Sequence, residues 1–104
     1  MAAIVVLTTV PDRRLGRRIA KRLVRDKLAA CVSMGGSINS VYRWKGKIES
    51  AQEALLIIKT SRAVFSKLEK KLKAIHPYES PEIIALPVIA GSVKYLKWIE
   101  NSVK

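Results

Sequence analysis

The sequence predicts an α+β domain, a ferredoxin-like βαββαβ sandwich with an extended β-hairpin and a short C-terminal helix. Segments rich in β-branched residues alternate in that order with amphipathic helical segments. Two long strand-like segments are joined by a turn at Gly46. The length of 104 residues indicates a single domain over residues 1–104, and a hydrophobic fraction of 49% excludes a disordered chain.

The first strand and the first helix follow from local composition. Residues 3–9 are apolar and mostly β-branched and are followed by Pro11, which is typical of a strand. Asp12 is a good N-cap, because its carboxylate accepts hydrogen bonds from the free N–H groups that begin a helix. We therefore expect a helix from Asp12 to about Lys27.

A long β-hairpin is expected next. Residues 29–43 predict a strand with a bulge or kink at Gly35-Gly36. Gly46 can adopt the positive φ that a tight hairpin demands, so residues 44–47 predict the turn. Residues 48–59 then predict the returning strand.

The second half of the chain repeats the pattern. Thr60 or Ser61 is expected to cap a helix that runs to residue 75 and ends before Pro77, because the residue before a proline disfavours helix. Residues 82–89 predict a fourth strand. Ser92 is expected to cap a short terminal helix.

The charge of the chain is strongly positive. Twenty Lys and Arg against eight Asp and Glu give a formal net charge of +12. The first predicted helix carries much of this excess on its outer face, in the residues Arg13, Arg14, Arg17, Arg18, Lys21, Arg22, Arg25 and Lys27. The basic helix Arg13–Lys27 is therefore either a solvated face or a surface for an anionic ligand or an acidic protein partner.

The strand segments predict self-association. Residues 4–7, 55–58 and 83–86 are apolar throughout, which is typical of strands covered on both faces. Two helices cover only one side of a four-stranded sheet, so we expect further copies of the chain to cover the other side. A closed ring with cyclic symmetry satisfies this requirement.

The sequence predicts a cytoplasmic protein that does not enter a membrane. No segment approaches the roughly 20 apolar residues of a spanning helix, and no secretory signal pattern is visible. Cys31, the single cysteine, cannot form an intramolecular disulfide. The scarcity of Asn, Gln and Cys suits a thermostable protein.

Residues that carry chemistry are few. His76 and Cys31 are the single histidine and cysteine, so one chain cannot supply the four ligands of a structural zinc site. Imidazole and thiolate ligands suit copper, and symmetry can gather several copies of one ligand, which makes both residues metal-ligand candidates. The alternatives are a buried apolar role for Cys31 and a helix-end role for His76.

The segment of residues 76–82 holds an imidazole, a phenol, two carboxylates and two prolines. Proline fixes φ, so these groups keep nearly constant relative positions, either as the wall of a binding site or as a stiff connector. RNA recognition by base stacking is not expected, because the central strands carry no aromatic residues.

A series of motifs spans nearly the whole chain, about residues 4–99. They are Thr8-Thr9-Val10-Pro11-Asp12, Lys27-Leu28-Ala29-Ala30-Cys31-Val32, Tyr42-Arg43-Trp44-Lys45-Gly46-Lys47-Ile48-Glu49, Ile57-Ile58-Lys59-Thr60, His76-Pro77-Tyr78-Glu79, Pro81-Glu82-Ile83-Ile84-Ala85-Leu86-Pro87-Val88 and Tyr95-Leu96-Lys97-Trp98. In this order they strongly resemble the CutA, or divalent-cation tolerance, family. The resemblance implies a tightly packed homotrimer of ferredoxin-like subunits, a cytoplasmic location, a general similarity to P-II-type signalling trimers, and no enzyme chemistry.

The resemblance also implies where a ligand would bind. It implies sites in clefts between subunits, with copper or another divalent cation as the ligand, no required cofactor and no catalytic residue. The candidate lining residues are Cys31, Trp44, Lys59, His76, Tyr78 and Glu82. The chain departs from some copper-binding relatives, because Thr8 replaces a thiol and Ile75 replaces a second histidine.

Other functions stay open on the sequence alone. A P-II-like sensor would bind a small anionic ligand, and a nucleic-acid-binding module would use the basic helix with an affinity that falls steeply with salt. An acyl phosphatase shares the predicted fold, but it needs an anion-binding loop with an arginine and a water-orienting asparagine. Residues 8–12, the first connection, have neither.

Overall fold

The structure is a computed structural model that describes residues 2–104, and it shows a mixed α+β architecture. Its elements in chain order are β1 (Ala3–Val10), α1 (Arg13–Arg25), β2 (Cys31–Trp44), β3 (Lys47–Ser61), the 3-10 turn η1 (Arg62–Val64), α2 (Phe65–Ile75), β4 (Ile84–Pro87) and α3 (Val93–Asn101). The predicted order of strands and helices is therefore confirmed.

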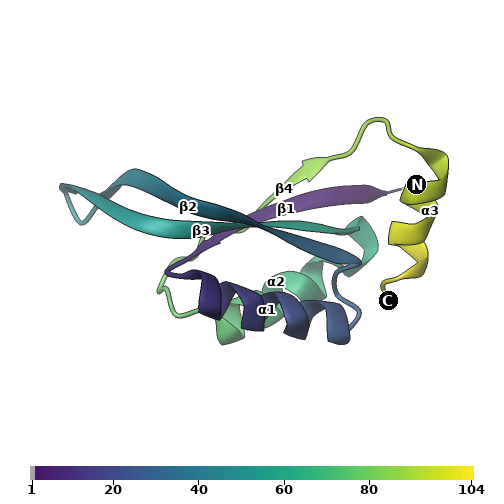
Figure 1. Cartoon of the computed structure of the whole chain (residues 1–104), viewed down its shortest axis with the longest axis horizontal. Coiled ribbons are helices and arrows are strands. Elements are labelled where there is room, and N and C mark those ends of the chain that lie inside the picture. Colours follow the sequence, from purple (N-terminus) through teal and green to yellow (C-terminus); the bar gives the residue numbers. More distant parts are fainter. Residues whose placement is uncertain (1) are drawn as a thin grey trace.

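The four strands form one antiparallel sheet in the order β2-β3-β1-β4. Helices α1 and α2 lie side by side against one face of this sheet (Figure 1). The β2-β3 hairpin extends beyond the helices at one end, and α3 lies at the other end beside the N-terminal end of β1 (Figure 1). The opposite face of the sheet, which we call the open face, is not covered by a helix layer.

The hydrophobic core lies between the sheet and the two long helices. Alternate residues of the strands point into it, and the apolar stripes of α1 and α2 pack against them. Its largest fully buried side chains include Val6, Val10, Leu23, Leu56, Ile58, Leu68 and Leu72. Each such side chain stabilises the fold by about 1.5–3 kcal/mol relative to an exposed one.

Local signals in the sequence place the turns and caps correctly. Asp12 caps α1, its carboxylate accepting from the N–H of Leu15 at 2.8 Å, and the Ser92 side chain caps α3. The hairpin turns at Lys45 and Gly46, whose φ angles of 51° and 80° match a two-residue turn of the primed type. The register of β2 against β3 shifts between Met34 and Ser37, which confirms the predicted irregularity.

The main differences from the predicted boundaries are in α1, α2 and β4, whereas β2 and β3 differ by one or two residues at their ends. Helix α1 ends at Arg25, because Lys27 adopts a φ of 59° and the N–H of Leu28 bonds back to the Leu23 carbonyl. This is a Schellman ending without the usual glycine, so no sequence signal marks it. Helix α2 begins at Phe65, after the 3-10 turn that Ser61 caps.

The fourth strand is shorter than predicted. Strand β4 covers only Ile84–Pro87 instead of residues 82–89. It pairs with the four residues Ile4–Leu7 of β1 and then ends at a proline. The side chains of Ile84 and Leu86 are each 48% exposed on the open face. The apolar strands are therefore covered on one face only by the described chain.

Candidate functional site

A cavity of about 840 Å³ lies on the open face, between the β2-β3 hairpin and the segment that follows α2. Every second residue of β2 and β3 points to the same face of the hairpin, and these side chains form one wall of the cavity. The segment after α2 supplies the facing wall. The aromatic and acidic lining residues are Tyr42, Trp44, Glu53, Tyr78, Glu79 and Glu82.

Glu53 and Tyr78 join the two walls. The Tyr78 hydroxyl donates a hydrogen bond of 2.7 Å to Oε2 of Glu53. Glu53 is only 8% exposed. Burial raises the pKa of Glu53, but hydrogen bonds from Ser40, Tyr78 and Thr9 outweigh it, so the pKa lies below its usual value. Glu53 is therefore a buried carboxylate at neutral pH.

The same contact acts on Tyr78 in the opposite direction. Burial, followed by the hydrogen bond to the Glu53 carboxylate, raises the pKa of Tyr78 well above its usual range. The phenol therefore stays neutral at every physiological pH and serves as a hydrogen-bond donor. Its role at this position is to hold Glu53 and the segment after α2 together.

His76 lies behind this wall and is almost completely buried. Its Nδ1 accepts a hydrogen bond from the Tyr78 N–H at 3.1 Å, and its Nε2 lies 2.8 Å from the Thr9 carbonyl oxygen. A carbonyl oxygen only accepts, so Nε2 is the donor in the contact with Thr9. Both ring nitrogens are thus used to position the backbone around Tyr78, and neither is open to a metal ion.

Cys31 lies in a second cluster on the open face. Lys59 is its cross-strand partner, and Nζ of Lys59 donates to Oγ of Ser33 and lies 3.9 Å from Sγ of Cys31. The ammonium group occupies the space next to the thiol and repels a second cation. The thiol is therefore not arranged as a metal ligand within one chain.

The two soft-ligand candidates of the sequence are not brought together. Cys31 lies opposite Lys59, which lies opposite Val5, whereas His76 contacts Thr9 on the same strand β1. The four residue steps from Val5 to Thr9 correspond to roughly 13 Å along a strand. Residues 2–104 contain no group of three His, Cys, Asp or Glu side chains that fits a metal ion.

The structure thus sorts the six predicted lining residues into three places. Trp44, Tyr78 and Glu82 line the cavity, Cys31 and Lys59 form the second cluster, and His76 supports the wall from behind. Sequence reasoning missed Glu53. The signal that could have found it is a single carboxylate placed just before a long apolar run in a strand.

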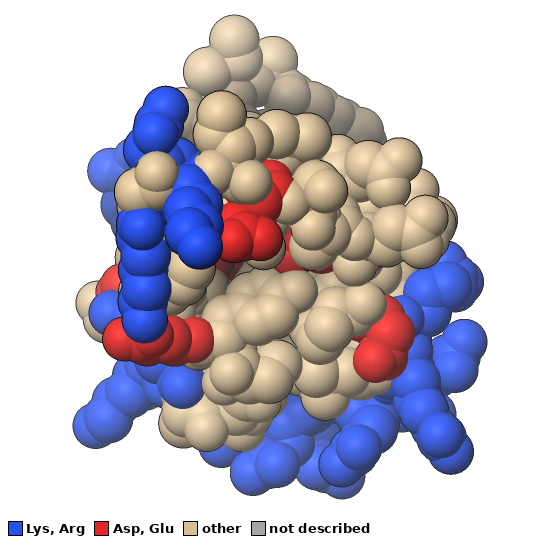
Figure 2. All heavy atoms as spheres, turned by 90° about the vertical axis from the view of Figure 1, so that its left-hand side faces the viewer, with Lys and Arg blue, Asp and Glu red and all other residues tan. Residues whose placement is uncertain are grey.

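The cavity is acidic although the chain is strongly basic. Figure 2 looks onto the hairpin end and shows acidic side chains near the middle of this face, with Lys and Arg around the margin. Glu53, Glu79 and Glu82 line the cavity together with three aromatic rings. Carboxylates and ring faces both attract cations, so this arrangement favours a positively charged ligand over an anion.

Comparison with known proteins identifies the family. The model of the family described as CutA1 divalent ion tolerance protein matches residues 4–102, nearly the whole chain. The chain belongs to the CutA1 family. The resemblance seen in the sequence motifs is therefore confirmed.

Individual relatives agree over most of the chain. The divalent-cation tolerance protein CutA of Thermus thermophilus is 47% identical over 98 residues, which are 94% of this chain and 95% of the relative. The chloroplastic protein CutA of Arabidopsis thaliana is 48% identical over 98% of this chain. This chain matches only 56% of the length of that plant protein, and 52% of the human protein CutA, which is 43% identical over 89% of this chain.

Solved structures of the family have the same fold. The Thermus thermophilus protein, a divalent cation tolerance protein, superposes with a TM-score of 0.96 at 45% identity and covers 98% of this chain and 99% of its own. CutA1 from Oryza sativa also gives 0.96 at 45% identity, over 100% of this chain and 95% of its own.

The names of the relatives do not agree on one cellular location. They include a chloroplastic protein and a periplasmic one from Archaeoglobus fulgidus, whose structure gives a TM-score of 0.94 at 39% identity over 98% of this chain and 99% of its own. No helix within residues 2–104 has the length and apolar character to cross a membrane.

Proposed function

We propose that this chain is a non-enzymatic, homotrimeric protein of the divalent-cation tolerance response that binds a metal cation in clefts between its copies. The acidic cavity is the observation that carries the proposal. Three of the eight acidic residues line it, in a chain with a net charge of +12. Its position on the open face means that a neighbouring copy would form part of its wall.

Assembly is supported by the open face of the sheet. Ile84 and Leu86 are half exposed there, beside the partly buried Val5 and Leu7 of β1. Exposed apolar patches of this kind mark interaction surfaces, and the projecting hairpin leaves strand edges that a neighbour can pair. The number three follows from the family resemblance. The strand order β2-β3-β1-β4 supports the ferredoxin-like class for each subunit.

Assembly is tested by sedimentation equilibrium at micromolar concentration. We expect a particle of three times the 11.6 kDa chain mass. The variant Leu86→Lys places a charge on the open face and should dissociate it, whereas Lys94→Glu on the exposed surface of α3 should not. A folded single chain in the wild type would contradict the proposal.

The exposed carboxylates are the first candidates for binding the cation. Glu79 and Glu82 are both exposed at the cavity, and carboxylate oxygens bind divalent cations such as Mn²⁺ and Cu²⁺. Because residues 2–104 of one copy hold no group of three ligands, a second copy has to complete the site. The cleft residues Trp44, Tyr78 and Glu82 are proposed on this basis, whereas Lys59 lies in the second cluster with Cys31 and would reach a cleft only in the assembled protein.

Copper binding by His76 and Cys31 would need a rearrangement. His76 would have to release the Thr9 carbonyl, and Cys31 would have to displace the ammonium group of Lys59. The residues of one copy do not fit a resident copper ion as they stand. We therefore propose the carboxylates as the first candidate ligands. His76 and Cys31 come after them, as ligands that only the assembled protein could use.

Calorimetric titration of the assembled protein with Cu²⁺ and with Mn²⁺ tests cation binding. We expect Glu82→Gln to weaken binding at least about tenfold, whereas Glu100→Gln in α3 removes the same charge away from the cavity and leaves it unchanged. Equal effects of the two variants, or no binding of either ion, would remove the cavity from the proposal. Cys31→Ser and His76→Ala then report whether the soft ligands take part in copper binding.

The cavity does not support the sensor of a small anion. Its carboxylates repel phosphate or carboxylate ligands, and no Lys or Arg lines it.

A cytoplasmic location remains part of the proposed function.

A further inference from the structure

The arginines of the chain are concentrated in one helix. Six of the eight arginines lie within the 13 residues of α1, together with Lys21, and no acidic residue lies within the helix. Elsewhere the chain mostly uses lysine for its positive charge. Arginine binds phosphate through two parallel N–H donors, whereas lysine acts as a point charge. A requirement for solubility alone would not separate the two residue types in this way.

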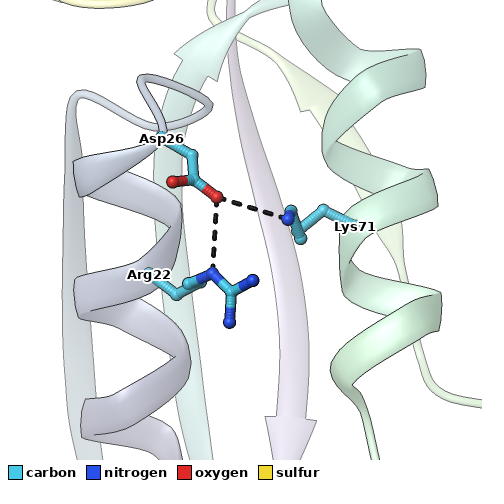
Figure 3. Close-up of polar contacts among 3 residues, drawn as sticks. All are labelled: Arg22, Asp26 and Lys71. Carbon is cyan, nitrogen blue, oxygen red and sulfur yellow. Dashed lines mark ion pairs between the residues drawn. The ribbon is translucent and has the colours of Figure 1, made fainter.

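The arginines lie on an exposed surface and few are neutralised. All seven basic side chains of α1 are exposed, whereas Gly16, Ile19 and Leu23 face the core. Arg22 pairs with Asp26, which also binds Lys71 of α2 and so links the two helices (Figure 3). Within the described residues, the other cations of α1 have no carboxylate within 4.0 Å.

The neighbouring helix extends the same charged surface. Helix α2 lies beside α1 on the face of the sheet opposite the open face (Figure 1) and carries four lysines. Figure 2 shows the resulting band of Lys and Arg along the helix side of the molecule. We call this surface, formed by the exposed basic residues of α1 and α2, the basic helix face. It lies on the opposite side of the sheet from the acidic cavity.

The shape of this face selects the kind of anion. Arg14, Arg18 and Arg22 form a row with one cation per helical turn, and the helix is about 20 Å long. The acidic cavity and a second cavity between β4 and the start of α2 are both lined by residues outside α1. An extended row of exposed cations instead suits the repeated phosphate charges of a nucleic acid strand.

The side chains on this face also distinguish between polyanions. Single-stranded nucleic acid is bound through stacking on aromatic rings, but α1 has none and the single aromatic residue of α2, Phe65, packs against the core. Binding to a lipid surface through a helix uses large apolar residues, but Val24 is the only large hydrophobic residue exposed on α1. Among these three polyanions, a duplex contacted through its phosphates fits the face best.

We propose that the basic helix face, with the arginines of α1 at its centre, binds the phosphate backbone of double-stranded nucleic acid without sequence preference. This surface is separate from the cation site of the proposed function and does not depend on it.

Fluorescence anisotropy of a labelled 20-base-pair DNA duplex of arbitrary sequence, titrated with the full chain between 50 and 300 mM NaCl, tests the proposal. The test variant replaces Arg14, Arg17 and Arg18 by Gln. The matched control replaces Lys94, Lys97 and Lys104 by Gln, which removes the same number of positive charges from the exposed C-terminal region. All six side chains are exposed, so both variants should fold, and circular dichroism confirms this before binding is measured.

We expect wild-type affinity to fall steeply with salt. If the three arginines contact three phosphates, the slope of log K against log salt becomes shallower by about 2.7 in the test variant. The control variant should keep the wild-type slope. The proposal is overturned by equal slopes in the two variants, or by the absence of duplex binding at 50 mM NaCl. It is also overturned if vesicles containing phosphatidylserine bind and the duplex does not.

Discussion

The hydroxyl of Tyr78 and the carboxylate of Glu53 meet at 2.7 Å, although 25 residues separate them in the chain. This hydrogen bond ties the segment after α2 to β3, and both residues line the acidic cavity. It also contributes to the charge state of both partners: with Ser40 and Thr9 it lowers the pKa of Glu53, and it adds to burial in raising the pKa of Tyr78. The two residues therefore support the shape and the charge of the candidate site together.

Removing the hydroxyl should weaken the fold measurably. We expect Tyr78→Phe to lower the free energy of unfolding by about 1–3 kcal/mol at pH 7, because Glu53 loses a donor while remaining buried. Urea denaturation measures the change. Tyr42→Phe is the matched control, since Tyr42 lines the same cavity but is 44% exposed. Equal losses in the two variants would show that the contact with Glu53 is not important for stability.

The lowered pKa of Glu53 predicts an acid-sensitive fold. Its stabilising contribution is fully present above the unfolded-state pKa of about 4.3 and is lost as the pH falls through the lower folded-state pKa. We expect the difference in unfolding free energy between the wild type and Glu53→Gln to shrink over this range. Urea denaturation at pH values between 2 and 7 checks it. A constant difference would mean that folding does not lower the pKa of Glu53.

Two buried threonines should respond in opposite directions to valine. Thr8 Oγ1 is buried and has no hydrogen-bond partner among the described residues, whereas Thr60 Oγ1 donates to the Leu28 carbonyl at 2.7 Å. Thr8→Val should therefore stabilise the protein by about 1 kcal/mol, and Thr60→Val should destabilise it by about 1–3 kcal/mol. Thermal unfolding compares them. A clear loss in Thr8→Val would show that its hydroxyl has a partner in solution.

The end of α1 offers a stabilising substitution. Lys27 has a φ of 59°, a conformation that costs a side-chain-bearing residue about 1 kcal/mol and that glycine adopts freely. We expect Lys27→Gly to raise the free energy of unfolding by roughly 0.5–1 kcal/mol. Lys67→Gly, inside α2, should lower it by about 1 kcal/mol. Destabilisation in both would indicate that the ending of α1 differs from the one seen here.

Most of the secondary structure could be predicted because its signals are local. Asp12 and Ser92 act on N–H groups three residues away, and Gly46 sets the turn through its own φ angle. The boundaries that were missed have no such signal. Lys27 ends α1 without a glycine, and β4 is short because only four residues of β1 lie opposite it.

The sequence by itself determined the order of the elements, the basic helix and, through its motifs, the family. Only the tertiary structure decided which candidate residues share a site. It brought Trp44, Tyr78 and Glu82 to one cavity with the unpredicted Glu53, and it placed His76 and Cys31 in separate positions. The physical reason is distance along the chain: the contact of His76 with Thr9 joins residues 67 apart, and such a contact depends on strand register and helix packing rather than on neighbouring residues.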